Sequence, residues 1–208
     1  MLRELSHLLI SAIVLSIAFG IALSDGLSAF KDTQLLFTSI WISFIAVALG
    51  FVSHEMAHRI MARKYGFSAS YYMSVIGLGI ALAVSLTGWI FAAPGGVRIY
   101  KNPNTEGPVI DDIKALGKIS VAGPLANILL VPAFFIFGLV VALIEAVSGE
   151  EPILWNIALF GMQINAWLAF FNMLPFGPLD GRDVYKWNKA VWVIVTLLAV
   201  GLYVFSII

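Results

Sequence analysis

The residues best suited to chemistry in this sequence are His54, Glu55 and His58, within the stretch His-Glu-Met-Ala-His. On a helix, positions 54 and 58 lie one turn apart on the same face, so both imidazoles can reach one metal ion. Two imidazoles at this spacing are typical of zinc ligands, and the neighbouring carboxylate can serve as the general base that activates water. The pattern predicts a hydrolytic zinc site. The plain alternative is two histidines and a carboxylate on a water-exposed helix.

The residues in front of this motif favour the metal site. From Phe44 to Val52 every residue is apolar or glycine, so the motif belongs to a helix at membrane depth. Ionisable side chains at that depth are costly to desolvate and are functional by default. We therefore expect His54 and His58 to bind a metal rather than to face water.

The composition places the whole chain in a membrane. Of the 208 residues 61% are hydrophobic and only 12% are charged, which is far too apolar for a soluble domain. We expect an all-α polytopic protein of the lipid bilayer, with residues 1–208 forming one domain. The chain has no cysteine, which excludes disulfides and thiolate metal ligands. The net charge of zero identifies no partner, and no nucleic-acid partner is expected.

Five stretches are long and apolar enough to span a bilayer. They run over about Leu8 to Leu23, Leu35 to Lys64, Lys118 to Val147, Ile153 to Leu174, and Ala190 to Ile208. Tyr71 to Pro94 is ambiguous, because it is apolar but rich in glycine and serine. It is followed by an extended segment that ends at Tyr100, and then by a polar loop over 102–112.

The positions of the lysines and arginines decide how often the chain crosses. With five spans, eleven of the twelve lie on one side and only Lys31 lies on the other. With six spans the same orientation leaves four inside and eight outside. The positive-inside rule favours five spans, with Tyr71 to Pro94 as a re-entrant hairpin and the histidine motif near the cytoplasmic face.

A catalytic zinc usually has three protein ligands, so a third ligand must come from elsewhere. His7 is the only other histidine and sits at the start of the first span, where an interfacial role is more common. The carboxylates at 145, 150 and 151 belong to the opposite end, and those at 106, 111 and 112 lie in the polar loop. Asp180 is the best candidate, because two prolines and two glycines unwind the apolar chain before and after it. Five spans place it on the same side as the two histidines, although an ordinary turn in water remains the alternative.

Both motifs together resemble the site-2 protease family of intramembrane zinc metalloproteases. That family combines a helical His-Glu-x-x-His with a later Asn-x-x-Pro-x-x-x-Leu-Asp-Gly, which here runs from Asn172 to Gly181. Ala122-Gly123-Pro124 matches a further signature, and the resemblance covers about 35–186. It implies one zinc ion per chain, bound by three residues, with one general base and one residue near the substrate or oxyanion. By position these are His54, His58 and Asp180 as ligands, Glu55 as base, and Asn172 beside the site.

The sequence thus predicts an intramembrane protease that cleaves transmembrane segments of other proteins in regulated intramembrane proteolysis. Two alternatives stay open: a polytopic metal-ion transporter that uses the same His/Glu/Asp cluster, and an inactive family member that acts as a membrane binding protein. Gln163 and Asn165 could line a path for water or could form hydrogen bonds between helices.

Overall fold

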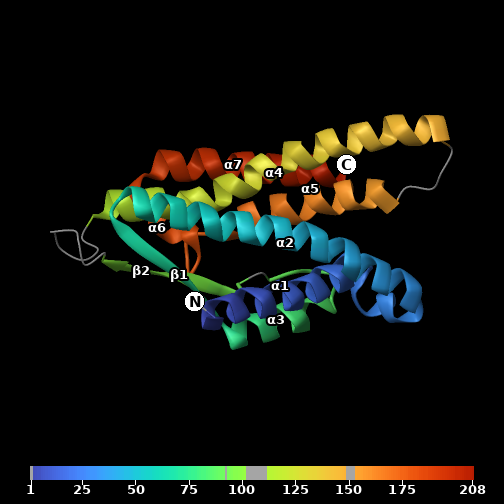
Figure 1. Cartoon of the computed structure of the whole chain (residues 1–208), viewed down its shortest axis with the longest axis horizontal. Coiled ribbons are helices and arrows are strands. Elements are labelled where there is room, and N and C mark those ends of the chain that lie inside the picture. The colour runs from blue at the N-terminus through green and yellow to red at the C-terminus, as the bar shows by residue number, and fades with distance from the viewer. Residues whose placement is uncertain (1, 92, 102–111, 149–152) are drawn as a thin grey trace.

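The computed structural model describes residues 2–91, 93–101, 112–148 and 153–208. Five of its helices are long and apolar enough to cross a membrane. They are α1 (Leu2–Leu23), α2 (Thr33–Lys64), α4 (Ile113–Ser148), α5 (Ile153–Asn172) and α7 (Lys189–Ile207). In Figure 1 these helices run along the long axis of the molecule in alternating directions. The prediction of an all-α membrane protein with five spans is confirmed.

Several helices begin earlier than hydropathy predicts, because polar residues form their first turns. α1 begins at Leu2 rather than Leu8, and α4 begins at Ile113 rather than after Lys118. Asp112, predicted to be only a solvated loop residue, caps α4 by accepting a hydrogen bond from the backbone N–H of Ala115 at 3.0 Å. The rest of the predicted polar loop lies outside the described residues.

Two short helices were not predicted. A 3-10 helix, η1 (Gly26–Lys31), lies where a polar loop was expected, and α6 (Asp180–Trp187) follows the unwound segment after α5. The long helices that come next are capped by side chains. Asp32 accepts from the N–H of Leu35 at the start of α2, and Asn188 accepts from two N–H groups at the start of α7. Only short polar segments separate these elements. The capping side chains in these segments determine the residue at which α2 and α7 start.

The segment between α2 and α4 is a re-entrant hairpin. It consists of β1 (Phe67–Met73), α3 (Val75–Ser85) and β2 (Gly95–Lys101), and the two strands pair antiparallel with Phe67 opposite Lys101. At 11 residues α3 is about 16 Å long, half of what a bilayer core requires. The hairpin therefore leaves and returns at the same end of the molecule (Figure 1). This confirms the re-entrant prediction, although β1 itself was not predicted.

The hairpin is fixed to α1 and α2 by buried and partly buried polar contacts. Glu4 on α1 forms an ion pair with Arg59 on α2 and accepts a hydrogen bond from the backbone N–H of Tyr71 at 2.8 Å. The Tyr71 hydroxyl is hydrogen-bonded to that of Ser11 at 2.8 Å. Irregular backbone at membrane depth is tolerated only where protein or water satisfies it, and these contacts supply that support.

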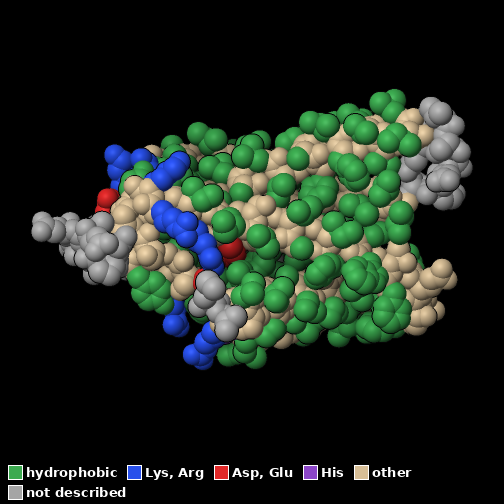
Figure 2. Space-filling view, viewed as in Figure 1, with side chains coloured by type: hydrophobic (Ala, Val, Ile, Leu, Met, Phe, Trp, Pro, Cys, Tyr) green, Lys and Arg blue, Asp and Glu red, His purple; other side chains and the backbone are tan. Residues whose placement is uncertain are grey.

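The positive charges gather at the end that holds the sheet. Figure 2 shows the Lys and Arg side chains of the visible face at the end where β1 and β2 lie in Figure 1. Arg63 and Lys64 end α2 there, and Lys114 belongs to the first turn of α4. The end of the bundle that carries the hairpin is thus also its positively charged end.

Candidate metal centre

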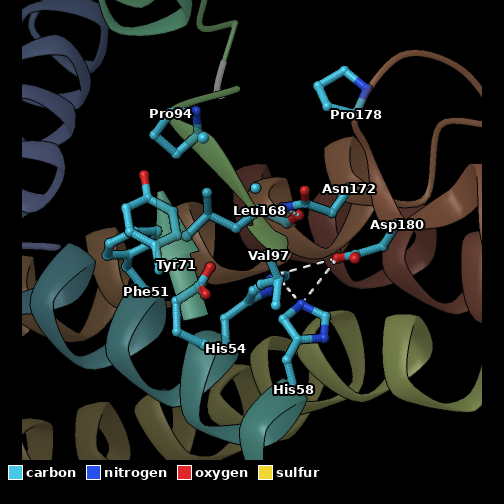
Figure 3. A pocket seen from close by; sticks show the side chains of 13 residues that line it. Phe51, His54, His58, Tyr71, Pro94, Val97, Leu168, Asn172, Pro178 and Asp180 are labelled. Atoms are coloured by element: carbon cyan, nitrogen blue, oxygen red, sulfur yellow. Dashed lines mark hydrogen bonds and ion pairs between the residues drawn. The ribbon is translucent and has the colours of Figure 1, made fainter. Parts of the chain in front are cut away.

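Three donor atoms meet in the interior close to this end of the bundle. His54 Nε2 lies 3.0 Å from His58 Nε2, and Asp180 Oδ2 lies 3.2 Å and 3.3 Å from these two nitrogens. Figure 3 shows the three side chains pointing toward one another. Both histidines are buried, and no other group of three such ligands is found among the described residues. The structure therefore brings together the three residues that the sequence predicts as metal ligands.

Two separate elements position these donors. His54 and His58 lie one turn apart on α2, on the face that packs inside the bundle. Asp180 is the first residue of α6 and follows a non-helical segment, residues 173–179, that contains Pro175 and Pro178. The unwinding before Asp180 was predicted from these prolines, whereas the helix that begins at Asp180 was not.

Gly181 explains why the chain can turn so tightly at Asp180. A Cβ atom built at position 181 would overlap the carbonyl group of Met173. Only glycine permits this close approach of the first turn of α6 to the end of α5. Because position 181 has no side chain, the first turn of α6 can pack against the end of α5. This packing places the Asp180 carboxylate against α2.

Hydrogen bonds to the other ring nitrogens orient both imidazoles. His58 Nδ1 lies 2.8 Å from the backbone carbonyl oxygen of Ile119, and His54 Nδ1 lies 2.7 Å from Asn127 Oδ1. An oxygen of this kind only accepts, so Nδ1 must carry the proton in each ring. In the neutral imidazoles the lone pair is then on Nε2, which is the atom that faces the other two donors. This is the arrangement of metal-binding histidines in proteins.

The donor set fits a zinc ion. Tetrahedral zinc, with bonds of about 2.0–2.2 Å to nitrogen and oxygen, holds its ligands about 3.3 Å apart. The three donor separations, 3.0 to 3.3 Å, match that value. Two lone pairs and a carboxylate oxygen at such distances repel one another unless a cation or a proton lies between them. Space is kept for an ion by Gly123 on α4, where a Cβ would collide with the imidazoles of His54 and His58.

Asp180 is ionised in this setting. Burial alone would raise the pKa of its carboxyl group, but the neighbouring imidazoles of His58 and His54 outweigh burial and lower the pKa of Asp180 to about 2. The carboxylate form is the one that binds a metal.

Glu55 and Asn172 border the same cavity, which has a volume of about 40 Å³. Glu55 is buried, and its Oε2 atom has no hydrogen-bond partner among the described residues. A buried carboxylate oxygen without a partner is unusual and calls for a functional explanation. Asn172 donates to the carbonyl of Leu168 in its own helix and lies beside Asp180 in Figure 3.

Of the other candidate ligands, those whose side chains the structure describes are not part of this group. His7 lies on α1 and does not join the three donors. Glu106, Asp111, Glu150 and Glu151 lie outside the described residues, and the side chain of Glu145 is not described. Gln163 and Asn165 form hydrogen bonds between helices, so of the two roles left open for them the structure supports this one.

Sequence reasoning assigned no role at the site to three residues, although Gly123 was noted as part of the Ala-Gly-Pro signature. The ring of Tyr71 borders the cavity, Gly123 leaves room beside the histidines, and Asn127 orients His54. Asn127 could have been found from the sequence, because a buried amide in an apolar span is as unusual as an ionisable group. Tyr71 gave no such signal, since its place depends on the unpredicted strand β1.

Comparisons with known proteins agree with this geometry. The chain is 39% identical to “Putative zinc metalloprotease MJ0611” of Methanocaldococcus jannaschii, over 96% of its own length and 92% of that protein. It is 28% identical to “Putative zinc metalloprotease YwhC” of Bacillus subtilis over 68% of this chain and 66% of the relative. “Zinc metalloprotease MJ0392” of M. jannaschii is 25% identical over 70% of this chain, but the match covers only 33% of that larger protein.

No family model matches the sequence, and no solved structure matches it significantly. The relative MJ0611 is nevertheless similar over nearly the full length of both chains, and its name gives the activity that the donor set fits. The spans, the helical His-Glu-x-x-His and the Asp-Gly turn all occur in the expected order. The protein is a membrane-embedded member of the site-2 protease family of zinc metalloproteases.

Proposed function

We propose that this protein is an intramembrane endopeptidase that hydrolyses peptide bonds within or near transmembrane segments of other membrane proteins. One observation carries the proposal. The His54–His58–Asp180 group lies in one cavity with the carboxylate of Glu55, whose Oε2 atom has no hydrogen-bond partner among the described residues, between helices long enough to span a bilayer. A hydrolytic site at that depth is suited to substrates that are themselves in the membrane.

The residues that line the cavity have different roles in the proposed reaction. His54, His58 and Asp180 would hold one zinc ion per chain, which supplies Lewis-acid chemistry by polarising the scissile carbonyl and acidifying water. Glu55 accepts a proton from the attacking water and delivers it to the leaving amine. Asn172 has one amide hydrogen engaged in its own helix, and its carboxamide can orient the substrate or the developing oxyanion.

Water and substrate can approach from different directions. A second cavity of about 230 Å³ borders His58 and Asp180 and is also lined by polar residues of α4 and α6, Ser120, Arg182 and Asp183. It supports a route for water from the charged end. Gly96 and Val97 of β2 border both cavities. In the described sheet β2 pairs only with β1, so its other edge is available to an unwound substrate segment that adds as a strand.

The location of the site supports a role in regulated intramembrane proteolysis. The donors lie near the end where α2 meets the hairpin, and eleven of the twelve Lys and Arg residues belong to segments at that end. By the positive-inside rule this end faces the cytoplasm. Cleavage near that face would release the cytoplasmic part of a substrate from its membrane anchor.

Cleavage by the purified protein tests the proposal. Candidate single-span proteins are incubated with it in detergent, with and without a chelator, and the products are mapped by mass spectrometry. We expect cleavage inside or beside the spanning segment, its loss with the chelator, and its recovery when zinc is added back. Zinc flux into proteoliposomes without cleavage would instead support a transporter. Substrate binding without cleavage or flux would support an inactive binding protein.

A further inference from the structure

A chain of buried amides runs from the backbone of α5 to the candidate metal centre. Asn165 Nδ2 donates to the carbonyl of Gly161 at 2.9 Å, and Asn165 Oδ1 accepts from Asn127 Nδ2, also at 2.9 Å. Asn127 Nδ2 also donates to the carbonyl of Gly50 at 3.2 Å, and Asn127 Oδ1 accepts from His54 Nδ1 at 2.7 Å. Neither asparagine is accessible to solvent.

In this chain of amides, the donor and the acceptor of every hydrogen bond are fixed. Backbone carbonyls only accept, so the groups that face Gly161 and Gly50 must be the NH₂ groups of the two asparagines. The oxygen of Asn127 therefore has to face His54, and His54 Nδ1 has to carry the proton. The lone pair of His54 is left on Nε2, where Asp180 and His58 lie.

The packing around the two amides is adapted to them. A Cβ atom at Gly50 would overlap the carboxamide of Asn165, so a side chain there would close the space that the amide occupies. The chain of buried amides involves residues of three spanning helices, α2, α4 and α5. Buried polar groups in a membrane are retained where they have a function, and neither asparagine belongs to the donor group itself.

We infer that Asn127 and Asn165 form a relay that positions His54 and fixes its tautomer for metal binding. The inference rests on the proposed zinc centre. Asn127 is a positioning residue that acts through His54, and Asn165 acts through Asn127. His58 has a different anchor, the carbonyl of Ile119, so the relay serves one of the two imidazoles.

Zinc affinity of the full-length protein in detergent tests the relay, measured by competition with a chromophoric chelator. Asn127→Ala should weaken zinc binding roughly 10–100-fold, the range for residues that orient metal ligands. Asn127→Asp keeps an oxygen that accepts from His54 Nδ1 and should bind zinc nearly as well as the wild type. Asn165→Ala should weaken binding less than Asn127→Ala, because Asn127 keeps its bond to Gly50. Gln163→Ala is the matched control, since this amide of α5 bonds to Ser206 outside the relay and its loss should leave the affinity unchanged.

If Asn127 had a purely structural role, its two variants would rank in a different order of zinc affinity. Without zinc, Asn127→Asp should be less stable to thermal unfolding than Asn127→Ala, because an added buried charge is costly. The relay thus predicts opposite orders for zinc affinity and for stability, whereas a packing role predicts the same order for both. Equal zinc loss in Asn127→Asp and Asn127→Ala would overturn the relay, and unchanged affinity in Asn165→Ala would remove Asn165 from it.

Failure of the metal centre itself gives a separate result. If His54→Ala binds zinc as the wild type does, the proposed centre is overturned and the relay with it. If His54→Ala loses zinc but Asn127→Ala does not, the centre stands and the relay alone is overturned.

Discussion

Gly123 of α4 faces the imidazole of His54 so closely that a Cβ at position 123 would lie 2.5 Å from His54 Nε2. The same Cβ would also collide with His58. Both rings are held at Nδ1 by hydrogen bonds, so neither can turn aside without losing its partner. The absence of a side chain at this one position keeps the space between the donor atoms open.

Gly123→Ala should therefore abolish zinc binding while the helices remain folded. We expect the affinity to fall by at least about 100-fold, at the upper end of the effects of changes beside ligands. Zinc content and circular dichroism of the purified variant measure the two properties. Gly201→Ala on α7 is the matched control, because a Cβ there meets no atom within 4 Å and should not change zinc binding. Normal zinc content in Gly123→Ala would contradict the location of the metal.

Removing any of the three donors should release the metal. The wild type is expected to contain about one zinc per chain, and His54→Ala, His58→Ala and Asp180→Asn should each lose most of it. Metal analysis after dialysis checks this result. His7→Ala and Asp183→Asn change the same residue types outside the donor group and should keep zinc. Stoichiometric zinc in the His54/His58 double variant would refute the assignment.

Glu55→Gln should distinguish the general base from the metal ligands, because it should reduce cleavage and leave zinc binding intact. The neutral amide has nearly the same shape but cannot accept the proton, so cleavage should fall by at least about a hundredfold while zinc and substrate remain bound. Cleavage rate, zinc content and substrate co-purification are measured on the same preparation. In a transporter this change should weaken ion binding or flux instead. An undiminished cleavage rate would show that Glu55 is not the general base and that the proposed proteolytic mechanism is wrong.

The five-span topology can be tested by cysteine labelling, since the native chain has no cysteine. Lys64→Cys and Lys114→Cys lie on either side of the hairpin and should both react with an impermeant reagent from the cytoplasmic side. Ser28→Cys in η1 should react only from the other side. All three positions are exposed, which makes the comparison direct. Labelling of positions 64 and 114 from opposite sides would disprove the re-entrant hairpin.

The spans were predictable because each is a long apolar run, and the charges on either side fixed their number. The helix ends were less predictable, since polar side chains such as Asp112 continue a helix beyond its apolar part. Strand β1 could not be found from hydropathy. Most of its residues are only partly buried, and its position depends on pairing with β2 about thirty residues later and on contact with Glu4.

The donors of the candidate site were predictable because ionisable residues in an apolar chain are few. The roles of Gly123 and Asn127 were not, because they depend on how α4 crosses α2, which no local pattern encodes. The assignment of the whole chain to one domain and the catalytic roles of Glu55 and Asn172 stay predictions.

The order in which the chain is made has a consequence for this site. The two histidines and their anchors, Ile119 and Asn127, all precede residue 128, whereas Asp180 starts a helix more than fifty residues later. Synthesis proceeds from the N-terminus, so the two histidines and their anchors are made before the third donor. The three-donor centre is complete only after α6 has docked. A nascent chain halted before residue 180 would therefore hold only two of the three donors.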